Sequence, residues 1–197
     1  MLIRFQTRHD SLIFKKYSIN QNHSIRVARI FDSKYFDSVF SSSVEADALW
    51  TTCSNTLILV KTGDCCAIVI LNTNLCAGVI HAGWRGACMG IVLNMFDDIR
   101  KTTNLNSYQF VAFMGPCIKV NAYNIKYKTT LEIPEQFLRL RKDQRIVLNL
   151  STLIRYQLDK LKICKINILN HCTFSKMNSY YSARRGDKQR QFSVVLL

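Results

Sequence analysis

The chain has 197 residues, with 27 lysines and arginines against 13 aspartates and glutamates, so its formal net charge is +14. The length predicts a single domain over residues 1–197, and 48% hydrophobic residues with only two prolines exclude disordered and collagen-like classes. The net charge points first to a polyanionic partner. The basic residues are scattered and no nucleic-acid-binding motif accompanies them, so no specific nucleic acid is expected.

Charged residues interrupt the N-terminal segment at Arg4, Arg8 and Asp10, which leaves no apolar core for a signal peptide. No stretch approaches the roughly 18 apolar residues of a transmembrane helix. These patterns predict a cytoplasmic protein without a membrane partner, in which the eight cysteines are reduced.

Short apolar runs rich in β-branched residues predict strands at 56–60, 67–71, 75–80, 110–114, 166–169 and 192–197. A polar turn at 72–74 predicts a hairpin between two of these strands. Their continuous apolarity is typical of strands buried on both faces. Apolar residues at helical spacing predict helices at 87–100 and 150–161. Strands and helices do not alternate strictly, which favours an α+β fold with mixed sheets.

Residues 80–86, Ile-His-Ala-Gly-Trp-Arg-Gly, have the composition of a ligand site between a buried strand and a helix. The glycines permit close approach of a ligand, and Arg85 and the helix N-terminus attract an anion. A strand-to-helix turn with a packed His81 and a surface arginine explains this segment equally well.

Two further segments carry chemically useful residues. In residues 62–66, Asp64 and Cys65 could serve metal binding or nucleophilic catalysis, although a turn with packed cysteines is favoured on this segment alone. Residues 180–190 form a dense basic loop that could bind phosphate or a nucleic-acid backbone, although such loops are usually solvated.

Together these strings resemble the YfiH family. TGDC, HAGWRG, GPCI followed by Tyr123, HCT, and YSARR with a later QR occur in the family's order over about residues 21–197. Members were described as multicopper polyphenol oxidases, or laccases, and are now regarded as zinc-dependent purine nucleoside phosphorylases. The resemblance implies mixed sheets sandwiched between helices, in α/β/β/α layers.

The resemblance implies a metal site at His23, Cys65 and His81. Three nitrogen and sulfur ligands suit zinc with one open position, the pattern of a catalytic site, and copper is the alternative metal. Catalytic roles are implied for Cys65, His81, Asp64 and Arg85, with Asp64 or Asp47 as a proton carrier. The implied substrate and phosphate contacts are Asp47, Arg85, Cys117, Tyr123, Arg184 and Arg185.

The sequence departs from the family pattern at four positions, which concern substrate specificity and activity. Ser24 replaces a glycine, Asn124 a glutamate, Ala183 a tyrosine and Gln189 a glycine. Only Thr7 and Arg8 match the family's longer N-terminal Thr-Arg-x-Gly-Gly string, so a shortened N-terminal segment is expected. A second copy of the chain, in a homodimer, could supply the missing pocket walls.

The implied activity is cleavage of adenosine, inosine or methylthioadenosine by phosphate, giving the free base and ribose 1-phosphate. Adenosine deamination is a second implied activity. Three alternatives remain open: a copper-dependent polyphenol oxidase, a basic nucleic-acid-binding protein, and a hydrolase with Cys65 as nucleophile and His81 as base.

Overall fold

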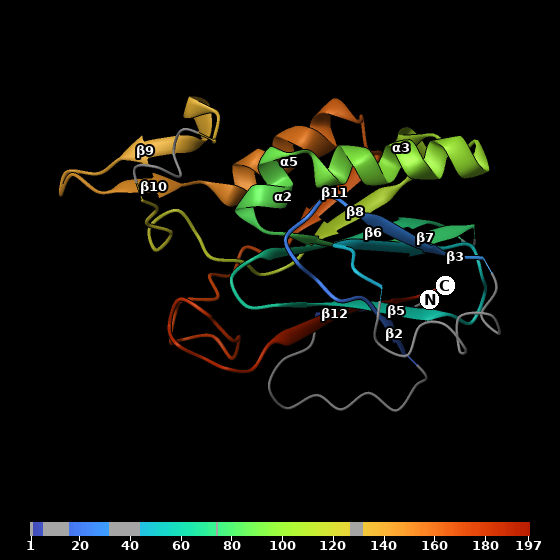
Figure 1. The fold of residues 1–197 in the computed structure, drawn as a ribbon, viewed down its shortest axis with the longest axis horizontal. Coiled ribbons are helices and arrows are strands. Elements are labelled where there is room, and N and C mark those ends of the chain that lie inside the picture. The colour runs from blue at the N-terminus through green and yellow to red at the C-terminus, as the bar shows by residue number, and fades with distance from the viewer. Residues whose placement is uncertain (1, 6–15, 32–43, 74, 127–131) are drawn as a thin grey trace.

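A computed structural model describes the chain except for residues 1, 6–15, 32–43, 74 and 127–131. Two β-sheets stack face to face, and helices cover the outer face of the larger sheet (Figure 1). The larger sheet has the order β11 (Lys165–Ile168), β8 (Val111–Met114), β6 (Cys66–Asn72), β7 (Cys76–Ala82), β4 (Ala48–Thr51) and β3 (Val27–Ile30). The smaller sheet has the order β1 (Leu2–Phe5), β12 (Gln191–Leu196), β5 (Leu57–Thr62) and β2 (Lys16–Ser18).

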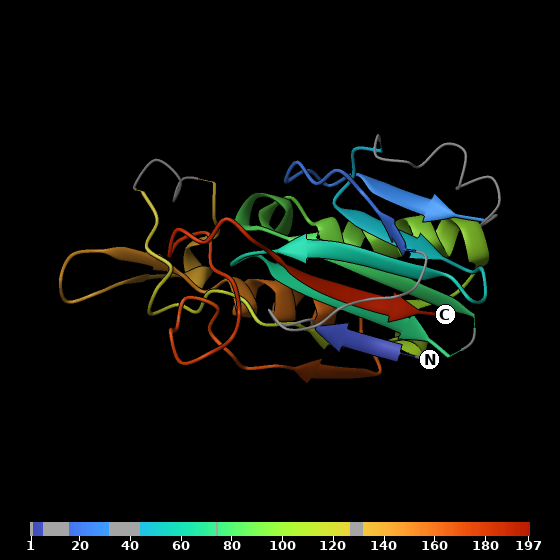
Figure 2. The ribbon, with the colours of Figure 1, turned by 90° about the horizontal axis from the view of Figure 1, so that it is seen from below.

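The remaining elements lie outside these two sheets. The helices are α2 (Trp84–Cys88), α3 (Ile91–Thr103) and α5 (Leu150–Lys160), with short 3-10 turns at Ser107–Gln109 and Glu135–Phe137. Strands β9 (Leu138–Leu140) and β10 (Ile146–Leu148) pair as a hairpin that projects from one end of the molecule (Figures 1 and 2). Among the described residues, no helix is long and apolar enough to span a bilayer.

The α+β class with mixed sheets is confirmed. Strand β6 pairs antiparallel with β7 and β8, whereas β8 pairs parallel with β11 and β3 parallel with β4. The predicted hairpin is the β6–β7 connection, where Asn72 lies opposite Cys76. The α/β/β/α layering implied by the family resemblance is found only in part: the described residues form the layers helix, sheet, sheet, and no described helix covers the smaller sheet.

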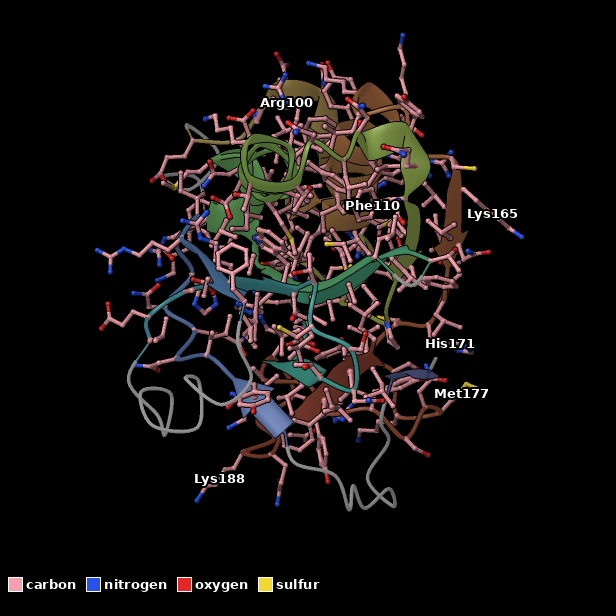
Figure 3. The ribbon with its side chains drawn as sticks, turned by 90° about the vertical axis from the view of Figure 1, so that its right-hand side faces the viewer. Arg100, Phe110, Lys165, His171, Met177 and Lys188 are labelled. Carbon is pink, nitrogen blue, oxygen red and sulfur yellow. The ribbon has the colours of Figure 1, made fainter. Side chains whose placement is uncertain are left out.

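Strand β6 is buried on both faces, as its continuous apolarity predicted. Ile68 and Ile70 pack toward the helices, while Val69 packs into the core between the two sheets. Figure 3 shows Phe110 inside the helix-facing core, whereas Lys165 and Lys188 point outward. These two cores fix the positions of the strand ends that carry the polar residues described below.

The helix predicted at 87–100 is wrong in its extent, because two helices occupy this region. Helix α2 starts at Trp84. Gly90, with φ of 86°, separates α2 from α3. This left-handed conformation favours glycine and interrupts the helical hydrogen bonds. The expected apolar stripe of α3 is buried, and it includes Met95, Phe96 and Ile99.

Candidate metal centre and adjoining cleft

Three predicted ligands from distant parts of the sequence meet at one end of the stacked sheets. The ligand atoms of His23, Cys65 and His81 all lie within 4.8 Å of one another. Cys65 Sγ is 3.7 Å from His23 Nε2, and the two imidazole rings meet edge to face with centroids 4.8 Å apart. Ligand atoms of a tetrahedral zinc site are separated by roughly 3.3–3.6 Å. The Cys65–His23 separation is close to this spacing, and small side-chain shifts would let the three side chains hold one metal ion. No other such group of three occurs in the part of the chain that the structure describes.

Asp47 connects the two histidine-bearing segments. Its side chain is fully buried immediately before β4, and one carboxylate oxygen accepts a hydrogen bond of 2.7 Å from His81 Nδ1. The carboxylate also accepts hydrogen bonds from the backbone amides of Asn22, His23 and Ser24 and from the Ser24 hydroxyl. Because Nδ1 of His81 faces Asp47, Nε2 is the atom left for a metal.

Contacts among Asp47, Cys65 and His81 shift the pKa values of these three side chains. Burial raises the pKa of Asp47, but hydrogen bonds from His81 and Ser24 outweigh it and lower the pKa to about 2. Burial raises the pKa of Cys65, yet hydrogen bonds with His23 and His81 lower it to about 7. For His81, burial lowers the pKa, while Asp47 and Cys65 raise it to about 9. A thiolate at Cys65 is therefore accessible near neutral pH, as metal ligation requires.

Gly83 leaves room for the metal-binding side chains. A Cβ atom at this position would lie 2.8 Å from His23 Cδ2 and 3.1 Å from Cys65 Sγ. Its backbone is extended, with φ of −77°, so lack of space and not backbone strain excludes a larger residue.

We expect Gly83→Ala to weaken metal binding because the added methyl group pushes the His23 ring and the Cys65 sulfur apart. Zinc affinity should fall by about tenfold or more, as for other changes that misplace ligands. Competition with a chromogenic chelator measures the affinity, and thermal unfolding tests whether the fold is retained. Wild-type zinc affinity in a folded Gly83→Ala protein would contradict this packing argument.

Asp64 is hydrogen-bonded to three segments that surround the metal-binding residues. It has φ of 89°, and its carboxylate oxygens accept hydrogen bonds of 2.7 Å from Thr173 Oγ1 and from the Arg184 backbone amide. Its backbone carbonyl accepts a hydrogen bond from the Ile118 amide. The side chain borders the cleft, but both oxygens already have donors, and its role as a proton carrier stays a prediction.

A cleft of about 600 Å³ opens over the three metal-binding side chains. Four cations line it: Lys61, Arg85, Arg184 and Arg190. The other lining residues are Gln21, His23, Gly63, Asp64, Cys65, His81, Trp84, Tyr123 and Ala183. Asp64 is the single acidic residue among them, and hydrogen bonds already occupy its carboxylate. The cleft therefore favours an anionic ligand.

A second hollow of about 480 Å³ adjoins the cleft. It shares Trp84, Tyr123 and Arg184 with the cleft and continues along Asn124, Ile125 and Lys126. The Arg184 guanidinium lies 5.4 Å from the Tyr123 ring centroid, and the Arg85 guanidinium lies 5.0 Å from that of Trp84. Burial raises the pKa of Tyr123, so its hydroxyl stays protonated.

Three predicted substrate contacts do not line the cleft. Asp47 is buried behind the metal-binding residues. Arg185 donates to the backbone carbonyls of Thr173 and Tyr180 and forms an ion pair with Asp187, so its guanidinium stabilises its own loop. Cys117 is fully buried, and its sulfur lies 3.3 Å from the Ser151 hydroxyl.

Sequence reasoning missed four residues of the cleft wall: Gln21, Lys61, Trp84 and Arg190. Trp84 belongs to the string HAGWRG, and Arg190 ends the basic loop 180–190 that could bind phosphate, but neither pattern singles out these two residues. Lys61 ends an apolar run and shows no local signal. Gln21 is placed only by tertiary contact, through hydrogen bonds with the backbone of Lys61.

Comparisons with known proteins agree with this fold. A family model described as multi-copper polyphenol oxidoreductase laccase matches residues 5–197. The chain is 26% identical to a purine nucleoside phosphorylase of Haemophilus influenzae, covering 90% of this chain and 72% of that protein. It is 27% identical to adenosine deaminase RL5 of an unknown prokaryotic organism, covering 84% and 68%. The crystal structure of Bacillus licheniformis hypothetical protein YfiH superposes with a TM-score of 0.82 at 22% identity, covering 92% and 74%.

Proposed function

The chain belongs to the family described as multi-copper polyphenol oxidoreductase laccase, and its relatives include proteins named purine nucleoside phosphorylase; from this premise we propose a function for it. We propose a zinc-dependent phosphorylase that cleaves purine nucleosides with inorganic phosphate. One observation carries the proposal: a two-histidine, one-cysteine group lies at the base of a cleft lined by four cations. The first feature suits a catalytic metal, and the second suits a phosphate substrate.

The donor set favours zinc. Two imidazoles and one thiolate leave a fourth tetrahedral position, and bound zinc would act there as a Lewis acid that polarises an oxygen atom. His23 and His81 would bind through Nε2 and Cys65 through its sulfur. Asp47 holds the His81 ring in this orientation through Nδ1.

The residues of the cleft match the two substrates of phosphorolysis. The reaction forms a bond from a phosphate oxygen to C1′ and breaks the C1′–N9 bond, whose electron pair stays on the base and is protonated. Phosphate requires cations, which the cleft supplies. A purine requires a flat apolar surface, and Trp84 and Tyr123 provide rings at the cleft wall and in the adjoining hollow.

The direct test is incubation of zinc-loaded protein with adenosine, inosine or methylthioadenosine, with and without phosphate. We expect phosphate-dependent release of the free base and formation of ribose 1-phosphate. Inosine formed from adenosine without phosphate would instead show deamination, the activity in the name of the RL5 relative. If no base is released at any phosphate concentration by protein that contains one zinc per chain, the proposed function is wrong.

A thiol hydrolase is the second candidate, and the contact between Cys65 and His81 favours it. Asp47, His81 and Cys65 are linked in the order of an acid–base–nucleophile triad, and the pKa of Cys65 is lowered to about 7. The second imidazole at Cys65 is unnecessary for such a triad but is required for a metal site. Metal analysis separates the two functions, since a hydrolase would lack stoichiometric zinc and would lose its activity on alkylation of Cys65.

Copper-dependent phenol oxidation is the activity in the family's description. Reduction of dioxygen to water by a multicopper enzyme uses several metal ions, whereas the described residues provide one group of three ligands. Metal analysis after expression with both copper and zinc, followed by assay with a phenolic substrate, distinguishes this activity from phosphorolysis.

A further inference from the structure

The family resemblance implies no role for two cations of the cleft, Lys61 and Arg190. Lys61 lies near the end of β5, and Arg190 directly precedes β12. These strands pair with Lys61 opposite Phe192 and Thr62 opposite Gln191, so Lys61 and Arg190 lie on neighbouring stretches of chain. Both side chains line the cleft that contains His23, Cys65 and His81.

Arg190 is held in place by its surroundings. Its Nη1 donates hydrogen bonds to the backbone carbonyls of Asp187, Lys188 and Gln189, at 2.8, 3.2 and 2.7 Å. Its aliphatic part crosses Gly63, where a Cβ atom would lie 2.7 Å from Arg190 Cδ. The guanidinium is therefore fixed beside the turn that carries Cys65, and its remaining N–H groups donate no hydrogen bond to any residue the structure describes.

Lys61 is also anchored through its backbone. Gln21 Nε2 donates to the Lys61 carbonyl at 2.7 Å, and the Lys61 amide donates to Gln21 Oε1 at 2.8 Å. The ammonium group lies 5.8 Å from the Phe192 ring centroid and donates no hydrogen bond within the described ranges. The pair thus offers several N–H donors and two positive charges on fixed backbone.

The other two cations of the cleft are placed differently. The Arg85 guanidinium lies against the Trp84 ring, and that of Arg184 lies against Tyr123 and donates to the Asn124 carbonyl. Trp84, Tyr123 and Arg184 border the adjoining hollow, whereas Lys61 and Arg190 do not. Arg85 and Arg184 therefore lie against the aromatic rings Trp84 and Tyr123, whereas Lys61 and Arg190 line the cleft apart from these two rings.

We propose that Lys61 and Arg190 form the subsite for the inorganic phosphate, with the purine on the opposite side near Trp84 and Tyr123. This inference rests on the proposed function, since it assigns one of the two substrates of that reaction. A phosphate dianion between an ammonium and a guanidinium gains charge-assisted hydrogen bonds and neutralises both charges. The phosphate oxygen that attacks C1′ is then held apart from the base that leaves with the electron pair of the C1′–N9 bond.

The test compares Lys61→Gln and Arg190→Gln with Lys188→Gln in zinc-loaded protein. Lys188 is an exposed neighbour that points outward and does not line the cleft, so its loss removes the same charge without touching the subsite (Figure 3). We expect the KM for phosphate to rise by about 10- to 100-fold in each subsite variant, as for loss of a hydrogen bond between charged groups. The KM for adenosine should change by less than about twofold, and Lys188→Gln should behave as wild type.

Calorimetric titration of inorganic phosphate into the zinc-loaded protein tests the subsite without catalysis. Binding to wild type that is weakened in both subsite variants supports the proposal, even if no nucleoside is cleaved and the proposed function fails. An unchanged KM for phosphate in both variants of an active enzyme would overturn it. Equal weakening in Lys188→Gln, or no phosphate binding by an inactive wild type, would overturn it as well.

Discussion

Replacement of His81 by alanine should reduce the bound zinc to far below one ion per chain and abolish phosphorolysis. The variant keeps two of three donors, and a zinc ion bound by several such donors gains about 10 kcal/mol or more in total. Loss of one donor therefore costs roughly 3 kcal/mol, which corresponds to more than a hundredfold in affinity. Metal analysis after dialysis against a weak chelator, together with the adenosine–phosphate assay, measures both effects.

The matched control is His171→Ala. His171 is exposed, and its nearest ring is that of Tyr180 at 6.0 Å, away from the three metal-binding residues. This variant should keep one zinc ion per chain and full activity. If His81→Ala still binds stoichiometric zinc with wild-type affinity, the metal site does not include His81.

The three metal-binding residues differ in how far the sequence alone indicates them. His81 lies in the buried strand β7 and Cys65 directly precedes β6, both in segments of unusual composition, so local pattern singles them out. His23 lies in a polar stretch and is predicted only through the family resemblance. Its place in the site depends on a left-handed φ of 62° and on the hydrogen bond from its amide to Asp47, which comes from a segment 24 residues away.

Local sequence pattern likewise predicts some of the strands but not others. Long apolar runs predicted β5, β6 and β7 because burial on both faces leaves a continuous hydrophobic pattern. The strands β3 and β4 have no such run, because Arg29 interrupts β3 and Thr51 is the single β-branched residue of β4. The pairing of β1 with β12 joins Leu2 to Leu196, a contact that no local pattern encodes.

Residue type alone also does not show which basic side chains line the cleft and which ones hold the surrounding backbone in place. Arg184 and Arg185 are adjacent in sequence, yet the first side chain lines the cleft and the second donates to the backbone carbonyls of Thr173 and Tyr180. The contacts of Ser24 explain why a serine fits at a position where the family has a glycine. Its hydroxyl donates to Asp47 and accepts a hydrogen bond from the Arg26 amide.

Asp47→Asn should weaken zinc binding by about 10- to 100-fold although Asp47 is not one of the three metal-binding residues, since this is the usual cost of losing a carboxylate behind a ligating histidine. The carboxylate accepts hydrogen bonds from His81 Nδ1, three backbone amides and the Ser24 hydroxyl. An asparagine presents one oxygen and an NH₂ group, so some of these donors would face another donor. Each buried donor left without an acceptor costs roughly 1–3 kcal/mol of unfolding free energy.

Glu45→Gln is the matched control for this change, because Glu45 lies two residues earlier in the chain. Its exposed carboxylate contacts Asn22 Nδ2 at 3.2 Å and Arg26 at 3.4 Å but neither histidine. Chelator competition should show wild-type zinc affinity for Glu45→Gln and a loss for Asp47→Asn, while urea unfolding reports stability separately. A folded Asp47→Asn protein with unchanged zinc affinity would mean that packing around His81 and His23, and not the buried carboxylate, orients the two rings.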